Sequence, residues 1–134
     1  MIIEKLDSGN DDDALTVVKS LRETHQIPHL DVVIANAGIS QDKAPAAVVK
    51  KQVMRDHFNV NAISVLLLYQ ATKPLLRPGG KFVAISSTSG SILDVAARPS
   101  SNIAYGASKA ALNYIIRKIY FQDKDLVTFS VHPG

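Results

Sequence analysis

Short apolar runs alternate with longer segments of helical periodicity along this chain. The apolar runs predict strands, which we place at residues 2–6, 31–35, 81–86 and 126–131. The run at 31–35 is uninterrupted, which is typical of a strand buried on both faces of a parallel sheet. Strands that alternate with helices predict an α/β fold built on a parallel sheet. Because the chain contains no internal repeat or linker, we expect residues 1–134 to form one domain or part of one.

The first helical segment opens with acidic residues at 11–13, which suit the positive N-terminus of a helix. Leu15, Val18 and Leu21 follow with helical spacing, and Pro28 ends the segment.

Two longer helical segments follow. One runs from Ala46 to Leu76 and ends at residues 77–80, and it could be broken near residues 57–59. The other runs from Tyr105 to Phe121. Its predicted apolar face consists of Ala107, Ala111, Ile115 and Ile119. Its candidate N-caps are Ser100, Ser101 and Asn102.

Composition narrows the class of protein. Hydrophobic residues make up 46% of the 134, enough for a sizeable core, so disorder is excluded. The formal net charge of +3 comes from dispersed residues, and the adjacent basic pairs at 50–51 and 117–118 are typical of solvated helix faces, so no nucleic-acid partner is expected. The chain has no cysteine, which fits a reducing compartment, and we expect a cytoplasmic location. No apolar run reaches membrane-spanning length and the first residues do not resemble a signal peptide, so no membrane partner is expected.

Candidate acid–base chemistry lies in Tyr105 and Lys109. On a helix their spacing puts both side chains on one face, one turn apart. A tyrosine phenol has a reference pKa of about 10, and a nearby cation favours its phenolate form. Ser87 follows the apolar run at 81–86 and can supply a hydroxyl donor. This set suits proton transfer to or from an alcohol or ketone, although the tyrosine–lysine pair alone is also common on ordinary helices.

Two other polar features invite interpretation. Asn36-Ala37-Gly38 follows the strand at 31–35, at the edge where open α/β sheets bind ligands, although a simple turn explains the same residues. Asn61 is an amide within an apolar helical segment, and an unpaired buried amide is costly, so it needs a partner.

Other catalytic classes have little support. His25 and His29 have the spacing of helical zinc ligands, but Pro28 interrupts that helix, so no metal site is expected. The sequence has no G-x-S-x-G motif, which argues against a serine hydrolase.

Together these motifs resemble the short-chain dehydrogenase/reductase family, in order and at nearly its spacings. The matching residues are Ala35-Asn36-Ala37-Gly38, Asn61, Ile85-Ser86-Ser87, Tyr105-Gly106-Ala107-Ser108-Lys109 and Pro133-Gly134. The resemblance covers almost the whole chain and is closest to the carbonyl-reducing branch, which includes fungal ketoreductases.

The resemblance implies a partial Rossmann-like, doubly wound parallel sheet with flanking helices. The four apolar runs match the family's third, fourth, fifth and sixth strands, whereas its first two strands, its last strand and its glycine-rich phosphate loop have no match. We therefore expect a single incomplete domain over residues 1–134 that binds its cofactor poorly or not at all. The run at 2–6 then lacks its native neighbour, so it should dangle or pair with the edge of the strand at 31–35.

The resemblance also implies hydride transfer between a nicotinamide cofactor and a small-molecule carbonyl or alcohol. Ser87 would hold the carbonyl oxygen, Tyr105 would donate the proton, and Lys109 would bond the nicotinamide ribose. Asn61 would hold a water in a proton relay. The implied cofactor-binding residues are Asp7, Asn36, Ala37, Gly38, Tyr105, Lys109, Pro133 and Gly134. NADP is favoured over NAD, although the residues that choose between them have no match in this chain.

Assembly and substrate choice follow from the same resemblance. A homodimer or tetramer would form through the two long helices. The exposed apolar patch expected there consists of Leu67, Leu68, Ile116 and Tyr120. The loop between Ser87 and Tyr105 is longer than is usual in the family and could shape substrate choice.

Two alternatives remain open. A related epimerase or dehydratase also uses the tyrosine–lysine pair, but such relatives usually lack the ending seen at residues 36–38. The chain could also be a truncated, inactive fragment that acts only as a dimerising or regulatory module, which the unmatched phosphate loop favours.

Overall fold

The computed structural model describes residues 1–97 and 102–134. The helices are α1 (Asp13–Glu23), α2 (Lys51–Phe58), α3 (Ser64–Thr72) and α4 (Ile103–Gln122). The strands are β1 (Leu30–Ala35), β2 (Leu76–Ile85) and β3 (Val127–Val131). Short turns of other helix types link them, namely a π-helix at Asn59–Ile63 and 3₁₀ turns at Lys73–Leu75, Thr88–Gly90 and Val95–Ala97.

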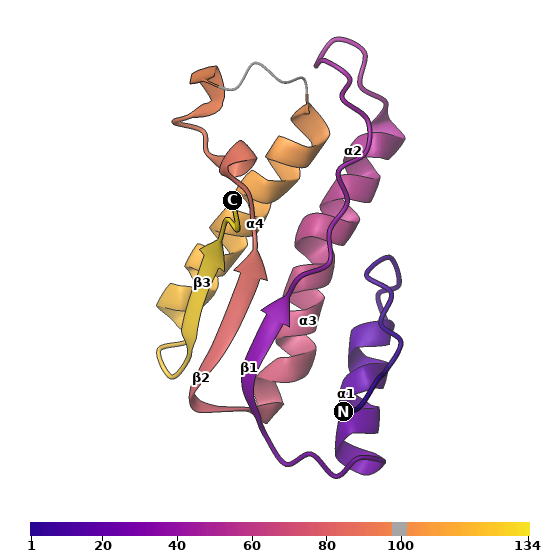
Figure 1. Cartoon of the computed structure of the whole chain (residues 1–134), viewed down its shortest axis with the longest axis vertical. Coiled ribbons are helices and arrows are strands. Elements are labelled where there is room, and N and C mark those ends of the chain that lie inside the picture. Colours follow the sequence, from indigo (N-terminus) through magenta and orange to yellow (C-terminus); the bar gives the residue numbers. More distant parts are fainter. Residues whose placement is uncertain (98–101) are drawn as a thin grey trace.

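The three strands form a parallel sheet in the order β1-β2-β3 (Figure 1). The predicted α/β fold and the strands near 31–35, 81–86 and 126–131 are confirmed. Because the strands are parallel, their carboxyl ends meet at one edge of the sheet, where Ala35, Ile85 and Val131 are the last strand residues.

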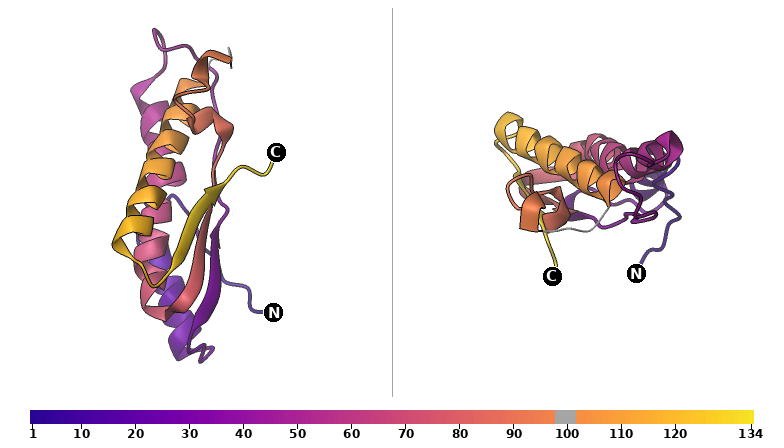
Figure 2. Two further views of the ribbon diagram at one scale, coloured as in Figure 1. Left: turned by 90° about the vertical axis from the view of Figure 1, so that its left-hand side faces the viewer. Right: turned by 90° about the horizontal axis from the view of Figure 1, so that it is seen from above.

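The helices cover one face of this sheet (Figure 2). Between them and the strands lies the main core, centred on Phe82 of β2 and Leu112 of α4, which are both 0% exposed. The ring of Tyr69 from α3 meets the ring of Phe82 edge-on, with centroids 5.3 Å apart. Full burial of one such side chain stabilises the fold by roughly 1.5–3 kcal/mol.

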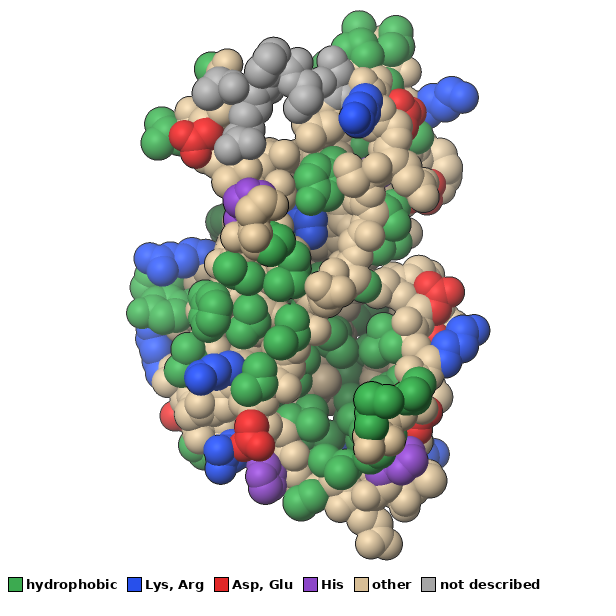
Figure 3. Space-filling view, viewed as in Figure 1, with side chains coloured by type: hydrophobic (Ala, Val, Ile, Leu, Met, Phe, Trp, Pro, Cys, Tyr) green, Lys and Arg blue, Asp and Glu red, His purple; other side chains and the backbone are tan. Residues whose placement is uncertain are grey.

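The opposite face of the sheet is not covered by the described residues. Val32 and Ile34 of β1 are 47% and 58% exposed, and Phe129 of β3 is 44% exposed. Figure 3 looks onto this side, where hydrophobic side chains gather over the strands. The prediction that the strand at 31–35 is buried on both faces is therefore wrong, since only the helix-facing side chains of β1 are buried.

The first apolar run was predicted as a strand that would either dangle or pair with the edge of the strand at 31–35. It is not a strand and does not pair with β1, so only the unpaired alternative is confirmed. Residues 2–6 have no assigned strand structure, because a strand needs a hydrogen-bonded neighbour and the described sheet ends at β1. The segment is instead tied to α1 by its side chains: Ser20 Oγ donates to a Glu4 carboxylate oxygen, and His25 Nε2 lies 2.9 Å from that same oxygen.

The long helical segment begins at Lys51 rather than Ala46, and the expected break is the π-helical turn at Asn59–Ile63. The regular helix ends at Thr72 and a 3₁₀ turn follows. Residues 77–80 were expected to be only a stop, but they belong to the start of β2, where the pairing with β1 slips between Leu30 and Val32.

The buried face of α4 differs from the predicted one. It consists of Ala104, Ser108, Lys109, Leu112, Ile116 and Ile119. The apolar residues alone predicted the wrong face, because the buried face of α4 also contains a serine and a lysine, which an apolar pattern does not include. Ile116 is consequently 2% exposed and cannot belong to the predicted exposed patch; Leu67 and Leu68 are half-buried, and Tyr120 is 42% exposed.

Asn102 occupies the N-cap position of α4 but makes no capping bond through its side chain. The other candidate caps, Ser100 and Ser101, lie outside the described residues. Within the described part of the chain, no helix combines the length and apolar character needed to cross a membrane.

Candidate active site

A pocket of about 250 Å³ lies at the carboxyl edge of the sheet, between the ends of all three strands and the first turns of α4. Its lining consists of Asn36, Gly38, Ile39, Ser40, Ile85, Ser86, Ser87, Tyr105, Lys109, His132, Pro133 and Gly134. The structure thus brings Ser87, which is distant in sequence, to the same pocket as Tyr105 and Lys109, which lie one helical turn apart.

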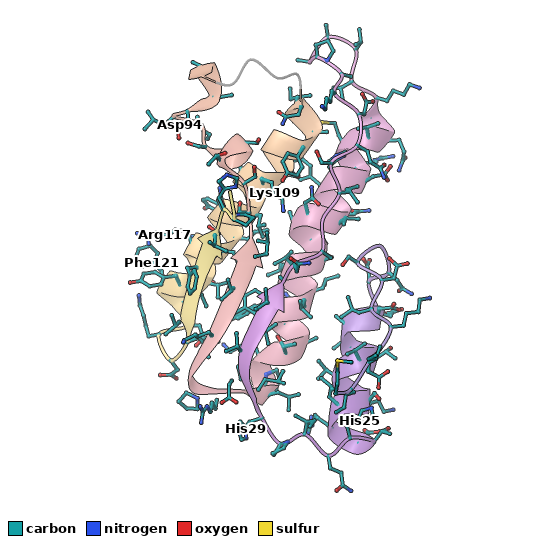
Figure 4. The ribbon with its side chains drawn as sticks, in the orientation of Figure 1. His25, His29, Asp94, Lys109, Arg117 and Phe121 are labelled. Atoms are coloured by element: carbon teal, nitrogen blue, oxygen red, sulfur yellow. The ribbon has the colours of Figure 1, made fainter. Side chains whose placement is uncertain are left out.

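Lys109 reaches this pocket from inside the fold. Its side chain is 4% exposed, and its ammonium nitrogen donates a hydrogen bond to the carbonyl oxygen of Ile85 at 2.8 Å. The same nitrogen lies 5.7 Å from the centre of the Tyr105 ring. Burial lowers the pKa of Lys109 from its ordinary value. Figure 4 shows Lys109 on α4, beside the carboxyl ends of β2 and β3.

Ser87 is fixed by the 3₁₀ turn that follows β2. Its hydroxyl oxygen accepts a hydrogen bond from the amide of Ser89 at 3.1 Å, which leaves the hydroxyl proton free to be donated. Two glycines allow this turn to approach α4 closely. A Cβ added to Gly90 would lie 2.6 Å from the backbone carbon of Lys109, and one added to Gly106 would lie 2.9 Å from the carbonyl oxygen of Ser89.

Asn61 lies behind the pocket rather than in its lining, and it is 0% exposed. Its Oδ1 accepts from the amide of Ile39 at 2.8 Å, and its Nδ2 donates to the carbonyl oxygen of Ile39 and to Ser108 Oγ, both at 2.9 Å. Ser108 Oγ in turn donates to the carbonyl oxygen of Tyr105 at 2.7 Å. The amide therefore joins the segment after β1 to the helical turn that carries Tyr105.

This network defines what Asn61 can still do. Both of its amide protons are donated to protein atoms, so a water held by this side chain would have to donate to the remaining lone pair of Oδ1. The predicted partner for the buried amide is thus identified, whereas the water relay stays a prediction.

The predicted cofactor-binding residues do not all meet at this pocket. Asn36, Gly38, Pro133 and Gly134 line it together with the catalytic candidates. Ala37 faces a neighbouring apolar pocket, lined among others by Leu6, Ile34 and Val65. Asp7 lies in an exposed turn, where its Oδ1 accepts from the amide of Gly9 at 2.8 Å, and it is not part of either lining.

Several residues of the site were not singled out from the sequence. His132 and Ser40 line the pocket. Behind the lining, Ser108 accepts a hydrogen bond from Asn61, and His57 accepts one from the amide of Gln41. His57 precedes Asn61 by one helical turn, and that spacing was a signal only that the two side chains share one face of the helix.

The histidines at 25 and 29 lie at the opposite end of the molecule from Lys109 (Figure 4). His29 Nε2 lies 3.9 Å from Asp31 Oδ1, and His25 pairs with Glu4. Among the residues described here, no group of three or more potential metal ligands occurs.

The parallel sheet with helices and a ligand-sized pocket at its carboxyl edge is typical of Rossmann-like folds, and comparisons with known proteins agree. Residues 2–120 match a family model described as enoyl-(acyl carrier protein) reductase. The chain belongs to the short-chain dehydrogenase/reductase family.

Among characterised relatives, the chain is 39% identical to norsolorinic acid ketoreductases of Dothistroma septosporum and of Aspergillus parasiticus. Both matches cover 100% of this chain but 52% and 51% of those proteins, so the chain spans about half the length of these relatives.

Solved structures show the same relationship. NADPH-bound carbonyl reductase from chicken fatty liver superposes with a TM-score of 0.89 at 27% identity, over 99% of this chain and 57% of that one. Carbonyl reductase Sniffer of D. melanogaster superposes with a TM-score of 0.86 at 26% identity, over 98% and 58%. The predicted partial Rossmann-like fold is confirmed.

Proposed function

We propose that this protein is an NAD(P)-dependent oxidoreductase that reduces a ketone to an alcohol. The observation that carries the proposal is one pocket at the carboxyl edge of a parallel sheet, lined by Ser87, Tyr105 and the buried Lys109. The names of the similar proteins, which are ketoreductases and carbonyl reductases, support it.

The pocket residues fit the nicotinamide half of such a cofactor, whereas poor binding of the whole cofactor, expected from the unmatched phosphate loop, stays a prediction. A Cβ added to Gly38 would lie 3.5 Å from Lys109 Nζ and 3.2 Å from Asn61 Oδ1. Because glycine has no side chain, the space beside the Lys109 ammonium stays open for a ligand. Lys109 donates one ammonium proton to Ile85, so two remain for a ribose hydroxyl or another acceptor. The residues that would hold the cofactor are Asn36, Gly38, Tyr105, Lys109, Pro133 and Gly134.

NADP is favoured over NAD because one similar carbonyl reductase is described as NADPH-bound. Ala37 and Asp7 lie outside the pocket, and their contact with a cofactor stays a prediction. A cytoplasmic location and assembly through α3 and α4 also stay predictions.

The chain's own residues would supply positioning and the proton. A bound nicotinamide cofactor supplies the hydride. The Ser87 hydroxyl donates a hydrogen bond to the substrate's carbonyl oxygen and holds it near Tyr105. Tyr105 transfers its phenolic proton to that oxygen as the carbonyl carbon is reduced, so the carbonyl becomes an alcohol and a phenolate remains. The ammonium of Lys109 stabilises the negative charge of that phenolate.

The test is an assay of the purified protein with NADPH or NADH and a panel of aromatic ketones. We expect cofactor oxidation matched by formation of the alcohol. A substrate converted without net consumption of cofactor would favour the epimerase or dehydratase alternative. If no ketone is reduced with either cofactor, the reductase assignment fails and a non-enzymatic, dimerising or regulatory role becomes the better reading.

A further inference from the structure

His57 is a buried histidine whose role the proposed chemistry does not explain. It lies on the last turn of α2 and is 1% exposed. Its Nδ1 is 2.8 Å from the carbonyl oxygen of Val53, and its Nε2 is 3.1 Å from the amide nitrogen of Gln41. A carbonyl oxygen can only accept and an amide N–H can only donate, so the ring must carry its proton on Nδ1 and present a lone pair from Nε2. These two contacts require the neutral imidazole.

His57 and Asn61 act on the same short segment. One helical turn separates them, and they bind alternate residues of the chain after β1: His57 accepts from the amide of Gln41, and Asn61 binds both the amide and the carbonyl of Ile39. The side chains thus take the place of a neighbouring strand for a segment that has left the sheet. Ser40, which lies between the two held residues, lines the pocket together with Ile39.

The segment would otherwise have few constraints. Gly38 precedes it, and Asp42 follows it with a left-handed φ of 61°. Backbone groups that leave a sheet at a ligand-binding edge must find other partners, and here buried side chains provide them. Because the contact with Asn61 extends through Ser108 to the carbonyl of Tyr105, the wall of the pocket and the catalytic helix share one hydrogen-bonded framework.

We propose that His57 is a positioning residue of the reductase pocket. It fixes the amide of Gln41, and together with Asn61 it presents residues 39–41 as a preformed wall against which the carbonyl substrate is placed. This inference rests on the proposed function for its catalytic consequence, whereas the fixed wall itself can be measured without any activity.

Two substitutions separate the contacts of the imidazole. Glutamine can place an amide oxygen near the position of Nε2, so His57→Gln retains an acceptor for Gln41. Asparagine is shorter and reaches only the position of Nδ1, so His57→Asn retains a donor for Val53 but leaves the amide of Gln41 without a partner. The two variants are matched in chemistry and differ in which contact survives.

The first measurement is amide hydrogen exchange followed by NMR in the purified protein. We expect the Gln41 amide to exchange about tenfold faster or more in His57→Asn, because the loss of one ordinary hydrogen bond changes an equilibrium constant by about that factor. In His57→Gln the exchange rate should stay near that of wild type. The Ile39 amide is the internal control, because Asn61 holds it in all three proteins. Equal Gln41 exchange in wild type and His57→Asn, with Ile39 protected in both, would overturn the proposal.

The second measurement is steady-state ketone reduction by the same proteins. His57→Asn should raise KM for the ketone by about tenfold while kcat changes much less, and His57→Gln should restore KM. A fall in kcat alone that follows the loss of folded protein would mean that His57 is only structural, and would overturn the positioning role. If the wild type reduces no ketone, the proposed function fails, and the exchange rates still decide whether His57 fixes the wall.

Discussion

The ammonium nitrogen of Lys109 donates a hydrogen bond to the carbonyl oxygen of Ile85, 2.8 Å away, at the end of the central strand. This contact joins the helix that carries Tyr105 to the strand that leads to Ser87. It also places a positive charge where the side chain is only 4% exposed, and burial lowers the pKa of Lys109 as a result.

The lowered pKa of Lys109 predicts a pH dependence of stability. Between its folded value and the ordinary lysine value of about 10.4, the unfolded chain binds more protons than the folded chain, so this group's contribution to stability rises with pH through that window. We expect the free energy of unfolding of wild type, relative to Lys109→Met, to increase from neutral pH to about pH 10. Urea unfolding measures it, with the exposed-site variant Lys19→Met as control; a difference that stays constant with pH would contradict the prediction.

Tyr105→Phe should remove the proton donor while it retains the ring beside Lys109. Because general acid catalysis is typically worth about a hundred- to ten-thousand-fold, we expect kcat for ketone reduction to fall by about that factor. The dissociation constant for NADPH should change little, since the phenol is one of several residues that line the pocket. Turnover near the wild-type value would remove Tyr105 from the role, and Tyr114→Phe, on the exposed side of α4, is the matched control.

The sequence was sufficient for the parts of the fold that depend on local pattern. The short apolar segments at 31–35, 81–86 and 126–131, which became most of β1, β2 and β3, were predicted as strands from local pattern, and parallel pairing follows from the helices between them. The run at 2–6 also read as a strand, yet it forms none, because pairing depends on a neighbour that local pattern cannot supply.

The site was predictable only where chemistry and spacing coincide. Tyr105 and Lys109 share a helix, so their proximity follows from helical geometry. The contact between His57 and Gln41 depends on how the segment after β1 folds back on α2, and the link from Asn61 to Ser108 joins residues 47 positions apart. Neither contact has a local signature, so both required the three-dimensional arrangement.

Gly90 is predicted to be intolerant of a side chain. A Cβ at this position would lie 2.6 Å from the backbone carbon of Lys109 and 2.8 Å from the backbone nitrogen of Ala110, and backbone atoms cannot move aside cheaply. We expect Gly90→Ala to lower the free energy of unfolding by about 1–3 kcal/mol through overpacking, and to displace Ser87 from Tyr105. Gly9→Ala is the control, because its nearest contact is the flexible carboxylate of Asp7 at 3.2 Å. Equal stability of the two variants in urea would count against this prediction.

Asp123 follows the C-terminal end of α4, whereas the pocket lies at the first turns of that helix. Its Oδ2 accepts hydrogen bonds from Lys73 Nζ and from the Tyr69 hydroxyl, each at 2.8 Å. The hydrogen bond from Lys73 is the largest cause that holds the pKa of Asp123 below its ordinary value, and the bond from Tyr69 acts in the same direction. The carboxylate thereby ties the 3₁₀ turn after α3 to the C-terminal end of α4.

A carboxyl whose pKa is lowered by folding contributes stability that is complete above its unfolded value, about 3.9, and is lost as the pH falls through the folded value. Asp123→Asn should therefore be less stable than wild type at neutral pH, and the difference should shrink as the pH falls below about 4. Urea unfolding over this range measures it, with the exposed Asp11→Asn as control. A difference between wild type and Asp123→Asn that is the same at neutral and acid pH would mean that the charge of Asp123 contributes nothing to the tie.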